Sequence, residues 1–158
     1  VFVLVLFAIF AMTIVAVLAL GANQYKSLVE RDNNAYNKRI ITSYVSAQIR
    51  GYDRADAVKV GGFASPDVDD EVNTLHLLET IDGIRYDLKL YYYQGKVYEL
   101  FAAEESEMKP EDGVAIMDAK DLHFEKKGSL IRITSKDSEG RENETTVSMR
   151  SEESGVAL

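Results

Sequence analysis

An acidic segment is the first place in the sequence where neighbouring side chains could bind a ligand. It contains Asp67, Asp69, Asp70 and Glu71. Carboxylate oxygens are the ligands that Ca²⁺ prefers, and the ion takes roughly six to eight of them. The segment lacks the glycine and the distant bidentate glutamate of an EF-hand loop. We therefore interpret it as a solvated loop and expect no metal or other cofactor, with calcium binding by residues 67–71 as the open alternative.

Side chains for acid–base, nucleophilic or thiolate chemistry are scarce. The chain contains no cysteine, which excludes a disulfide framework, a cysteine nucleophile and thiolate metal sites. Its two histidines, His76 and His123, are too few for most zinc sites and have no acidic partner at a defined spacing. No nucleophile elbow, phosphate-binding loop or pair of catalytic carboxylates is recognisable. We therefore predict that the chain is not an enzyme.

A run of three tyrosines, Tyr91 to Tyr93, could form an aromatic surface for a carbohydrate or a protein partner. Successive side chains of a strand point to opposite faces, so Tyr92 lies on the other face from its two neighbours. Packing of the tyrosines in the core and over the sheet is the favoured interpretation. Tyr91 and Tyr93 remain the candidate surface contact.

The longest apolar stretch is residues 1–22, which read VFVLVLFAIFAMTIVAVLALGA and contain no charged side chain. A helix of this length rises about 1.5 Å per residue and covers roughly the 30 Å hydrocarbon core of a bilayer. We expect it to insert into the cytoplasmic membrane, with the rest of the chain extracytoplasmic. The side chains predicted to face the membrane or the core of a filament are Phe2, Leu4, Phe7, Ile9, Phe10, Ile14, Val17 and Leu18.

No helix breaker follows this stretch, so the helix is predicted to continue as an amphipathic segment over residues 23–51. Gly51 is a plausible end, because glycine readily adopts the left-handed conformation of a helix C-terminus. We expect only the last part of the segment to pack on the globular domain. The residues predicted for that packing are Tyr36, Ile40, Ile41, Tyr44 and Val45.

From residue 57 onward the apolar pattern alternates with period two, and turn signals separate the runs. Asp82-Gly83 is the strongest of these signals, because a tight hairpin turn needs positive φ at both central positions. The pattern predicts an antiparallel meander of about six or seven strands. The fold class is therefore α+β, a long membrane-length N-terminal helix packed by its C-terminal half on a small antiparallel sheet. The predicted divisions are residues 1–22, 23–51, 52–150 and a disordered tail, 151–158.

The charge is unevenly distributed. Residues 26–50 hold five basic and two acidic side chains, a net +3, and the first 25 residues carry no charged side chain. Since the whole chain carries −8, residues 51–158 carry −11. This head lacks the basic surface that binding to nucleic-acid phosphates requires. The basic segment 26–50 could contact anionic lipid headgroups, or it is an ordinary solvated helix.

An apolar N-terminal helix that continues into an amphipathic helix on a small antiparallel sheet resembles the plan of type IV pilins and pseudopilins. Three segments also resemble DUF4860, a family of uncharacterised Firmicutes proteins. They are YNKRIITSYVSAQIRGYDRADAVKV (36–60), IDGIRYDLKLYYYQGKVYELF (81–101) and LIRITSKDSEGRENETTVSMRS (130–151). The DUF4860 resemblance spans nearly the whole chain and implies no activity, whereas the pilin resemblance implies a pilin-like fold.

Two positions depart from the pilin pattern. Pilins usually begin with Phe or Met and carry Glu at the fifth mature position, where this sequence has Val1 and Val5. Either the sequence does not start at the mature N-terminus, or the subunit is atypical or minor.

Two functions follow as expectations. The first is a structural subunit of a type IV pilus-like or pseudopilus filament. Its partners would be identical or related subunits through the N-terminal helix, and the lipid bilayer before assembly. The second is a bitopic, membrane-anchored extracytoplasmic binding domain that does not polymerise. The sequence does not distinguish adhesion, secretion and DNA uptake, or a major from a minor subunit.

Overall fold

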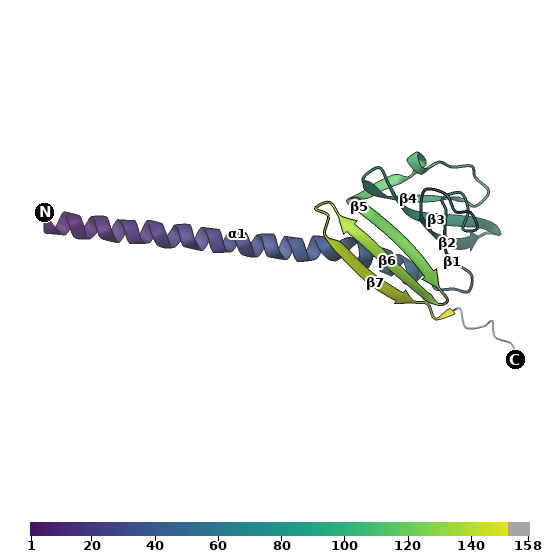
Figure 1. The fold of residues 1–158 in the computed structure, drawn as a ribbon, viewed down its shortest axis with the longest axis horizontal. Helices are drawn as coiled ribbons and strands as arrows, with labels where there is room; N and C mark the ends of the chain where they lie inside the picture. The colour runs from purple at the N-terminus through teal and green to yellow at the C-terminus, as the bar shows by residue number, and fades with distance from the viewer. Residues whose placement is uncertain (152–158) are drawn as a thin grey trace. The chain divides into compact units, whose positions relative to one another are not determined.

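The computed structural model describes the backbone of residues 1–151 and the side chains of residues 1–18 and 39–151 (Figure 1). The chain divides into two compact units, Val1–Asn37 and Lys38–Leu158, which are considered separately. Of the predicted disordered tail, only Ser151 belongs to the described residues. The last helical turns, from Lys38 onward, belong to the same unit as the sheet.

The sheet contains seven strands that pair antiparallel in the order in which they occur in the chain. One long helix, α1 (Phe2–Gly51), precedes it, and one short 3₁₀ helix, η1 (Pro110–Asp112), interrupts it. The strands are β1 (Val58–Gly61), β2 (Thr74–Ile81), β3 (Ile84–Tyr93), β4 (Lys96–Ala103), β5 (Val114–Lys127), β6 (Leu130–Asp137) and β7 (Glu142–Ser148).

The predicted fold class is wrong in two respects. Within the residues whose side chains are described, no helix is both long enough and apolar enough to cross a membrane. The second unit is mostly sheet, with seven strands rather than a small sheet under a dominant helix. The finding on the helix also overturns the prediction that it inserts into the cytoplasmic membrane and leaves an extracytoplasmic head.

Tight turns set the register of the central strands. Asp82 and Gly83 have φ values of 51° and 82°, and Gln94 and Gly95 have 44° and 85°. Positive φ at both central positions matches the right-handed twist of the flanking strands, which is why such turns connect hairpins. The turn predicted at Asp82-Gly83 therefore joins β2 to β3, and the turn at Gln94-Gly95 joins β3 to β4.

The sheet is curved because β5 pairs with different neighbours along its length. Its first residues pair with β4, and residues 119–127 pair with β6. The other edge of β5 meets the start of the sheet through side chains. Asn73 Oδ1 accepts a hydrogen bond from the Phe124 N–H at 2.7 Å, and Asn73 Nδ2 donates to the Phe124 carbonyl at 3.2 Å. Lys126 Nζ donates to the Val58 carbonyl at 2.9 Å. The sheet therefore bends until β5 lies beside β1.

The curved sheet encloses the last turns of α1. Ile41, Val45 and Ile49 are at most 1% exposed, and they form one apolar cluster with side chains of the strands. Because these positions are four residues apart, they lie on one face of the helix. Figure 1 shows β5, β6 and β7 passing beside this part of the helix. The strand residues of the cluster are Val58, Leu75, Leu77, Leu88, Leu90, Val97, Ala119, Leu122, Phe124, Ile131, Ile133 and Val147.

The turn between β6 and β7 is held by one carboxylate. Asp137 Oδ1 accepts hydrogen bonds from the backbone N–H groups of Glu139 and Arg141, each at 2.9 Å, and Oδ2 pairs with Arg141 Nε at 2.7 Å. Burial raises the pKa of Asp137, but these hydrogen bonds and the arginine charge outweigh it and hold the pKa below its ordinary value of 3.8. The ionised form is therefore the one that the fold stabilises.

We expect Asp137→Asn to destabilise the protein by about 1.5–3 kcal/mol at pH 7, because hydrogen bonds to a charged acceptor are lost. A lowered pKa contributes stability above the unfolded-state pKa, and that contribution disappears as the pH falls through the folded-state value. The difference between the two proteins should therefore shrink below pH 3.8. Urea unfolding at several pH values measures it, and an equal difference at pH 7 and pH 3 would contradict the account.

Candidate assembly surface

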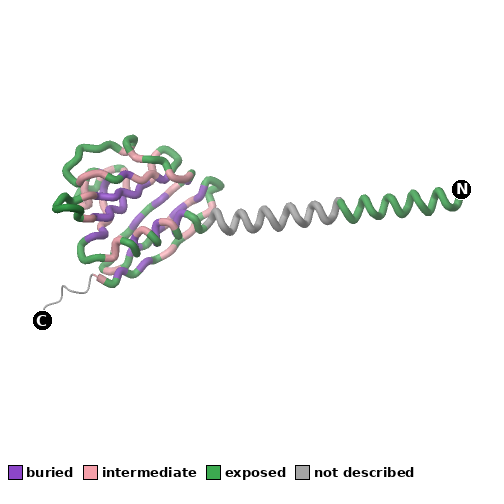
Figure 2. The backbone as a smooth tube through the Cα atoms, turned by 180° about the vertical axis from the view of Figure 1, so that it is seen from behind, coloured by how far each residue is buried: buried purple, intermediate pink, exposed green. Residues whose placement is uncertain are grey.

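The first eighteen residues form a helical surface on which every side chain is exposed (Figure 2). Ile14, the least exposed of the large apolar residues, retains 45% of its accessible surface, and Phe2 retains 81%. Single exposed apolar residues are normal, but a continuous patch marks a surface that contacts a partner. The large apolar residues of this surface are Val1, Phe2, Val3, Leu4, Val5, Leu6, Phe7, Ile9, Phe10, Met12, Ile14, Val15, Val17 and Leu18.

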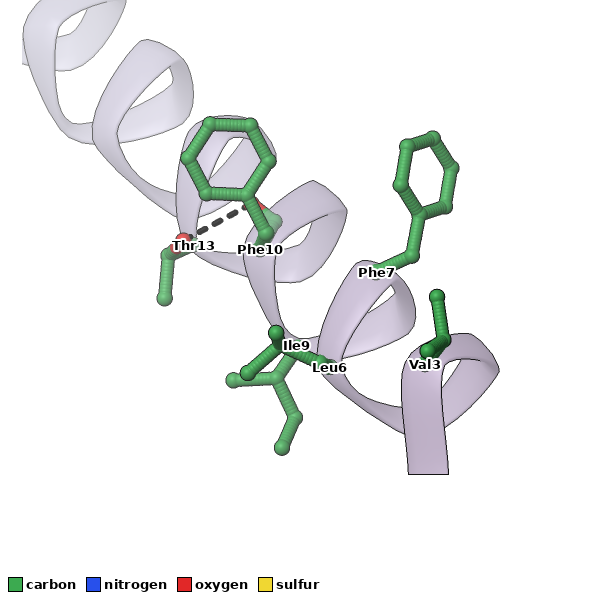
Figure 3. Close-up of a pocket in the computed structure, with 6 residues that line it drawn as sticks. All are labelled: Val3, Leu6, Phe7, Ile9, Phe10 and Thr13. Atoms are coloured by element: carbon green, nitrogen blue, oxygen red, sulfur yellow. Dashed lines mark hydrogen bonds between the residues drawn. The ribbon is translucent and has the colours of Figure 1, made fainter. Parts of the chain in front are cut away.

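The side chains of this surface leave hollows suited to another helix. Figure 3 shows six of them projecting from the helix around a hollow: Val3, Leu6, Phe7, Ile9, Phe10 and Thr13. Residues 3, 6, 7 and 10, and then 6, 9, 10 and 13, each form the diamond of four positions that receives one side chain in knobs-into-holes packing. A facing helix could therefore place one side chain in each diamond.

The surface carries no charged side chain that burial would have to remove from water. None of residues 1–18 has a charged side chain. The Thr13 hydroxyl on this surface donates to the Phe10 carbonyl of the same helix at 2.7 Å (Figure 3). Removing an unpaired polar or charged group from water is costly, and this surface carries no such side chain. All eight residues predicted for the membrane or filament core lie on it in exposed positions.

The residues predicted to pack between helix and sheet have different environments. Ile41 and Val45 are buried, whereas Ile40 is 37% exposed. Tyr44 packs at the edge of the cluster, and its hydroxyl donates to Glu99 of β4. The side chain of Tyr36 lies outside the described residues. The helix presents its 41–45–49 face to the sheet, and Ile40 points to one side of that face.

The tyrosine run does not form the predicted surface contact. Tyr91 is fully buried, makes an edge-to-face contact with Phe63 and donates to the Pro110 carbonyl at 2.7 Å. Burial, with the nearby Tyr98 and Asp112, raises the pKa of Tyr91 to about 12. Tyr93 is partly exposed and packs against the small apolar cluster of Phe63, Tyr91 and Leu100. The prediction of a surface contact through Tyr91 is therefore wrong, because two loops cover that face of the sheet.

A buried charged cluster on β2 and β3 was missed in the sequence. His76 Nδ1 lies 2.7 Å from Asp87 Oδ2, and Lys89 Nζ lies 4.0 Å from the same oxygen. All three residues are at most 8% exposed. The pairing of His76 with Lys89 and of Leu78 with Asp87 places the three side chains on the face opposite α1. The available signal was the pair of charges at 87 and 89 inside an otherwise apolar strand.

Two side chains of this charged cluster form hydrogen bonds with the backbone of the loop between β1 and β2. His76 Nε2 lies 2.8 Å from the Gly62 carbonyl, and Lys89 Nζ donates to the Phe63 carbonyl at 2.9 Å. A Cβ on Gly61 would lie 2.1 Å from the Pro66 carbonyl oxygen, so the loop closes tightly on itself. Because loop backbone occupies the second nitrogen of His76, the His–Asp pair has a structural role here.

The acidic segment belongs to the same loop. The Asp70 carboxylate accepts hydrogen bonds from the N–H groups of Ala64 and Val72, at 3.0 and 2.9 Å. Burial raises the pKa of Asp70, but these bonds and the nearby His76 outweigh it and hold the pKa below its ordinary value. Within the described residues, no three acidic or histidine side chains gather closely enough to hold a metal ion. Asp67, Asp69 and Glu71 are exposed.

Comparison with known proteins adds one relationship. The family model described as "Domain of unknown function (DUF4860)" matches residues 36–138. No curated protein and no solved structure matches the chain. The matched segment contains the charged cluster, whereas the apolar surface of residues 1–18 precedes it. The resemblance to type IV pilins is not confirmed, and the predicted link to a pilus or secretion system is withdrawn because the family match is the sole indication found.

Proposed function

The chain belongs to the DUF4860 family of domains of unknown function, and we propose that it is a structural subunit that assembles with identical or related chains into a filament. The apolar helical surface of residues 1–18 is the assembly surface. The observation that carries the proposal is the continuous exposure of its large apolar side chains.

The entropic cost of association is larger than the energy gained by burying one side chain, so a stable contact must bury many side chains at once. Burial of one exposed Phe, Leu or Ile contributes about 1.5–3 kcal/mol. Association costs about 4–15 kcal/mol in lost translational and rotational freedom, before any ordering of side chains. Several side chains must therefore be buried together, and residues 1–18 offer fourteen large apolar ones. A partner that covers only one or two of them would bind weakly.

The charge of the rest of the chain fits a structural role of this kind. Residues 51–158 carry a net −11, which keeps assembled heads soluble through mutual repulsion at the surface of the assembly. The same charge disfavours nucleic acid as a partner. The proposal includes no catalytic step.

Polar substitution of the assembly surface tests the proposal. We expect Phe7→Ser with Phe10→Ser to weaken assembly of the full chain by about 100-fold, because two large side chains lose roughly 1.5 kcal/mol each. The matched control is Val114→Ser with Leu130→Ser, two apolar residues of the head that are 67% and 47% exposed. Analytical ultracentrifugation measures the association, and negative-stain electron microscopy shows the form of the assembly. Equal association of the two double variants would contradict the proposal.

A helix exchange separates assembly from simple tethering. Residues 1–18 are replaced by an unrelated apolar helical sequence of the same length. If specific side-chain packing holds the subunits, ordered assembly is lost although hydrophobicity is retained. A binding domain that does not polymerise would remain monomeric before and after the exchange, which would contradict the proposal.

A further inference from the structure

The face of the sheet that holds α1 continues past the end of the helix. Just past α1, Arg54 contacts Glu79 of β2 at 3.0 Å, and near the end of the helix Tyr44 donates to Glu99 of β4. Burial, followed by the charge of Glu79, raises the pKa of Tyr52. Beyond these two glutamates, β2 extends to Ile81, β3 begins at Ile84 and β4 extends to Ala103.

Four side chains of this extension form an apolar patch, which we call the acceptor patch: the exposed Ile81, Ile84 and Phe101, and the half-buried Tyr86. Ile81 and Ile84 are directly paired across the β2–β3 hairpin, and Phe101 is opposite the core residue Leu88. Tyr86 stacks on Phe101, with ring centroids 5.1 Å apart and planes 9° from parallel. Strand alternation places all four on the face that carries Leu77 and Leu88, which pack against the helix.

The acceptor patch remains open to solvent in the described part of the chain. Ile81, Ile84 and Phe101 are 42%, 52% and 50% exposed. On the same face, the neighbouring Glu79 is already paired, since Arg54 contacts it at 3.0 Å. An apolar partner that covers the patch therefore leaves the Glu79 carboxylate with its cation.

We propose that the acceptor patch receives the N-terminal helix, residues 1–18, of a second copy of the chain. The inference rests on the proposed function and supplies the second surface that assembly requires. Continuity with the α1 site supports a helix as the occupant, because the same curved face already holds the turns of α1 that carry Ile41, Val45 and Ile49. Residues 1–18 are an apolar helical segment whose described side chains are all exposed, and they match the aliphatic and aromatic patch in chemistry.

A contact of this kind has consequences for the form of the assembly. The helix of one copy would bind the head of another, so the two contacting surfaces differ. Such heterologous contacts repeat without closing unless the rotation forms a ring, and they generate open filaments. Pairing of helices alone, with the same surface on both copies, would give closed dimers or bundles.

Two variants of the full chain test the contact. The patch variant carries Ile84→Ser with Phe101→Ser, and the helix variant carries Phe7→Ser with Phe10→Ser. Each is expected to lose the ability to grow filaments, with association weakened at least about tenfold. Mixed in equal amounts, they should form a one-to-one complex, because the intact helix of the patch variant binds the intact patch of the helix variant. Analytical ultracentrifugation resolves this complex from larger species.

The controls keep the two proposals distinguishable. Thermal unfolding of the patch variant checks that its head is folded, and Val114→Ser, which changes an exposed apolar residue outside the patch, should assemble normally. If the patch variant assembles like the unmodified chain and the helix variant does not, the acceptor patch is overturned while the proposed function stands. Absence of the one-to-one complex in the mixture would also overturn the acceptor patch. If the unmodified chain does not associate, the proposed function itself fails.

Discussion

Replacing Asp87 by alanine is expected to lower the free energy of unfolding by about 3–5 kcal/mol, because removal of one partner leaves a buried charge uncompensated. Asp87 is 4% exposed, and its Oδ2 faces both His76 and Lys89. Those two side chains also hold the carbonyls of Gly62 and Phe63, so the loop between β1 and β2 should loosen as well. Urea unfolding followed by circular dichroism measures the stability.

Glu125→Ala is the matched control for this prediction. Glu125 also forms an ion pair, with Arg132 at 3.4 Å, but both side chains are more than half exposed. Exposed pairs contribute about 0–1 kcal/mol, so this variant should unfold almost like the unmodified chain. Equal destabilisation by the two substitutions would show that the buried cluster does not stabilise the fold in the way described.

Replacing Ile49 by alanine is expected to cost about 2–5 kcal/mol, because a fully buried side chain is removed and the curved sheet cannot close around the space. Ile49 is 0% exposed and packs in the cluster that joins the last turns of α1 to the sheet. The same unfolding experiment measures the effect, and hydrogen exchange of the last helical turns should become faster.

Ile40→Ala on the same helix is the comparison. Ile40 is 37% exposed and lies to one side of the buried face. Alanine is the better helix former, so this variant should lose at most about 1 kcal/mol. If Ile40→Ala destabilises as strongly as Ile49→Ala, the helix does not pack on the sheet through the face that we describe.

Local patterns predicted the elements of the head well. The turns at 82–83 and 94–95 require residues that tolerate positive φ, and the alternation in β3 separates Tyr92 from Tyr91 and Tyr93. The buried positions 41, 45 and 49 follow helical spacing. These features depend on neighbouring residues, so the sequence contains enough information to predict them.

Features that depend on distant residues were not predictable in the same way. The curvature arises where β5 exchanges β4 for β6 as a neighbour and where Asn73 bonds the backbone of Phe124, 51 residues away. The pairing of His76 with Asp87 needs the register of β2 and β3, which no local spacing reveals. Tyr91 remained a candidate surface contact beside the favoured core packing, because the loops that bury it are separate parts of the chain.

The apolar composition of residues 1–22 was not enough to identify a membrane-spanning helix. Residues 1–22 meet a compositional criterion for crossing a bilayer, yet no helix of the described residues satisfies the criteria for a membrane span. An exposed apolar helix can be stabilised by another protein surface as well as by lipid. We assign that stabilising role to other copies of the same chain.

Sedimentation velocity of the unmodified full chain, over a hundredfold range of concentration and without detergent, tests the central claim most directly. Assembly through residues 1–18 predicts a sedimentation coefficient that rises with concentration, and a return to the monomer value in the Phe7→Ser, Phe10→Ser variant. A single monomeric species at every concentration would contradict the claim. So would association that the two substitutions leave unchanged.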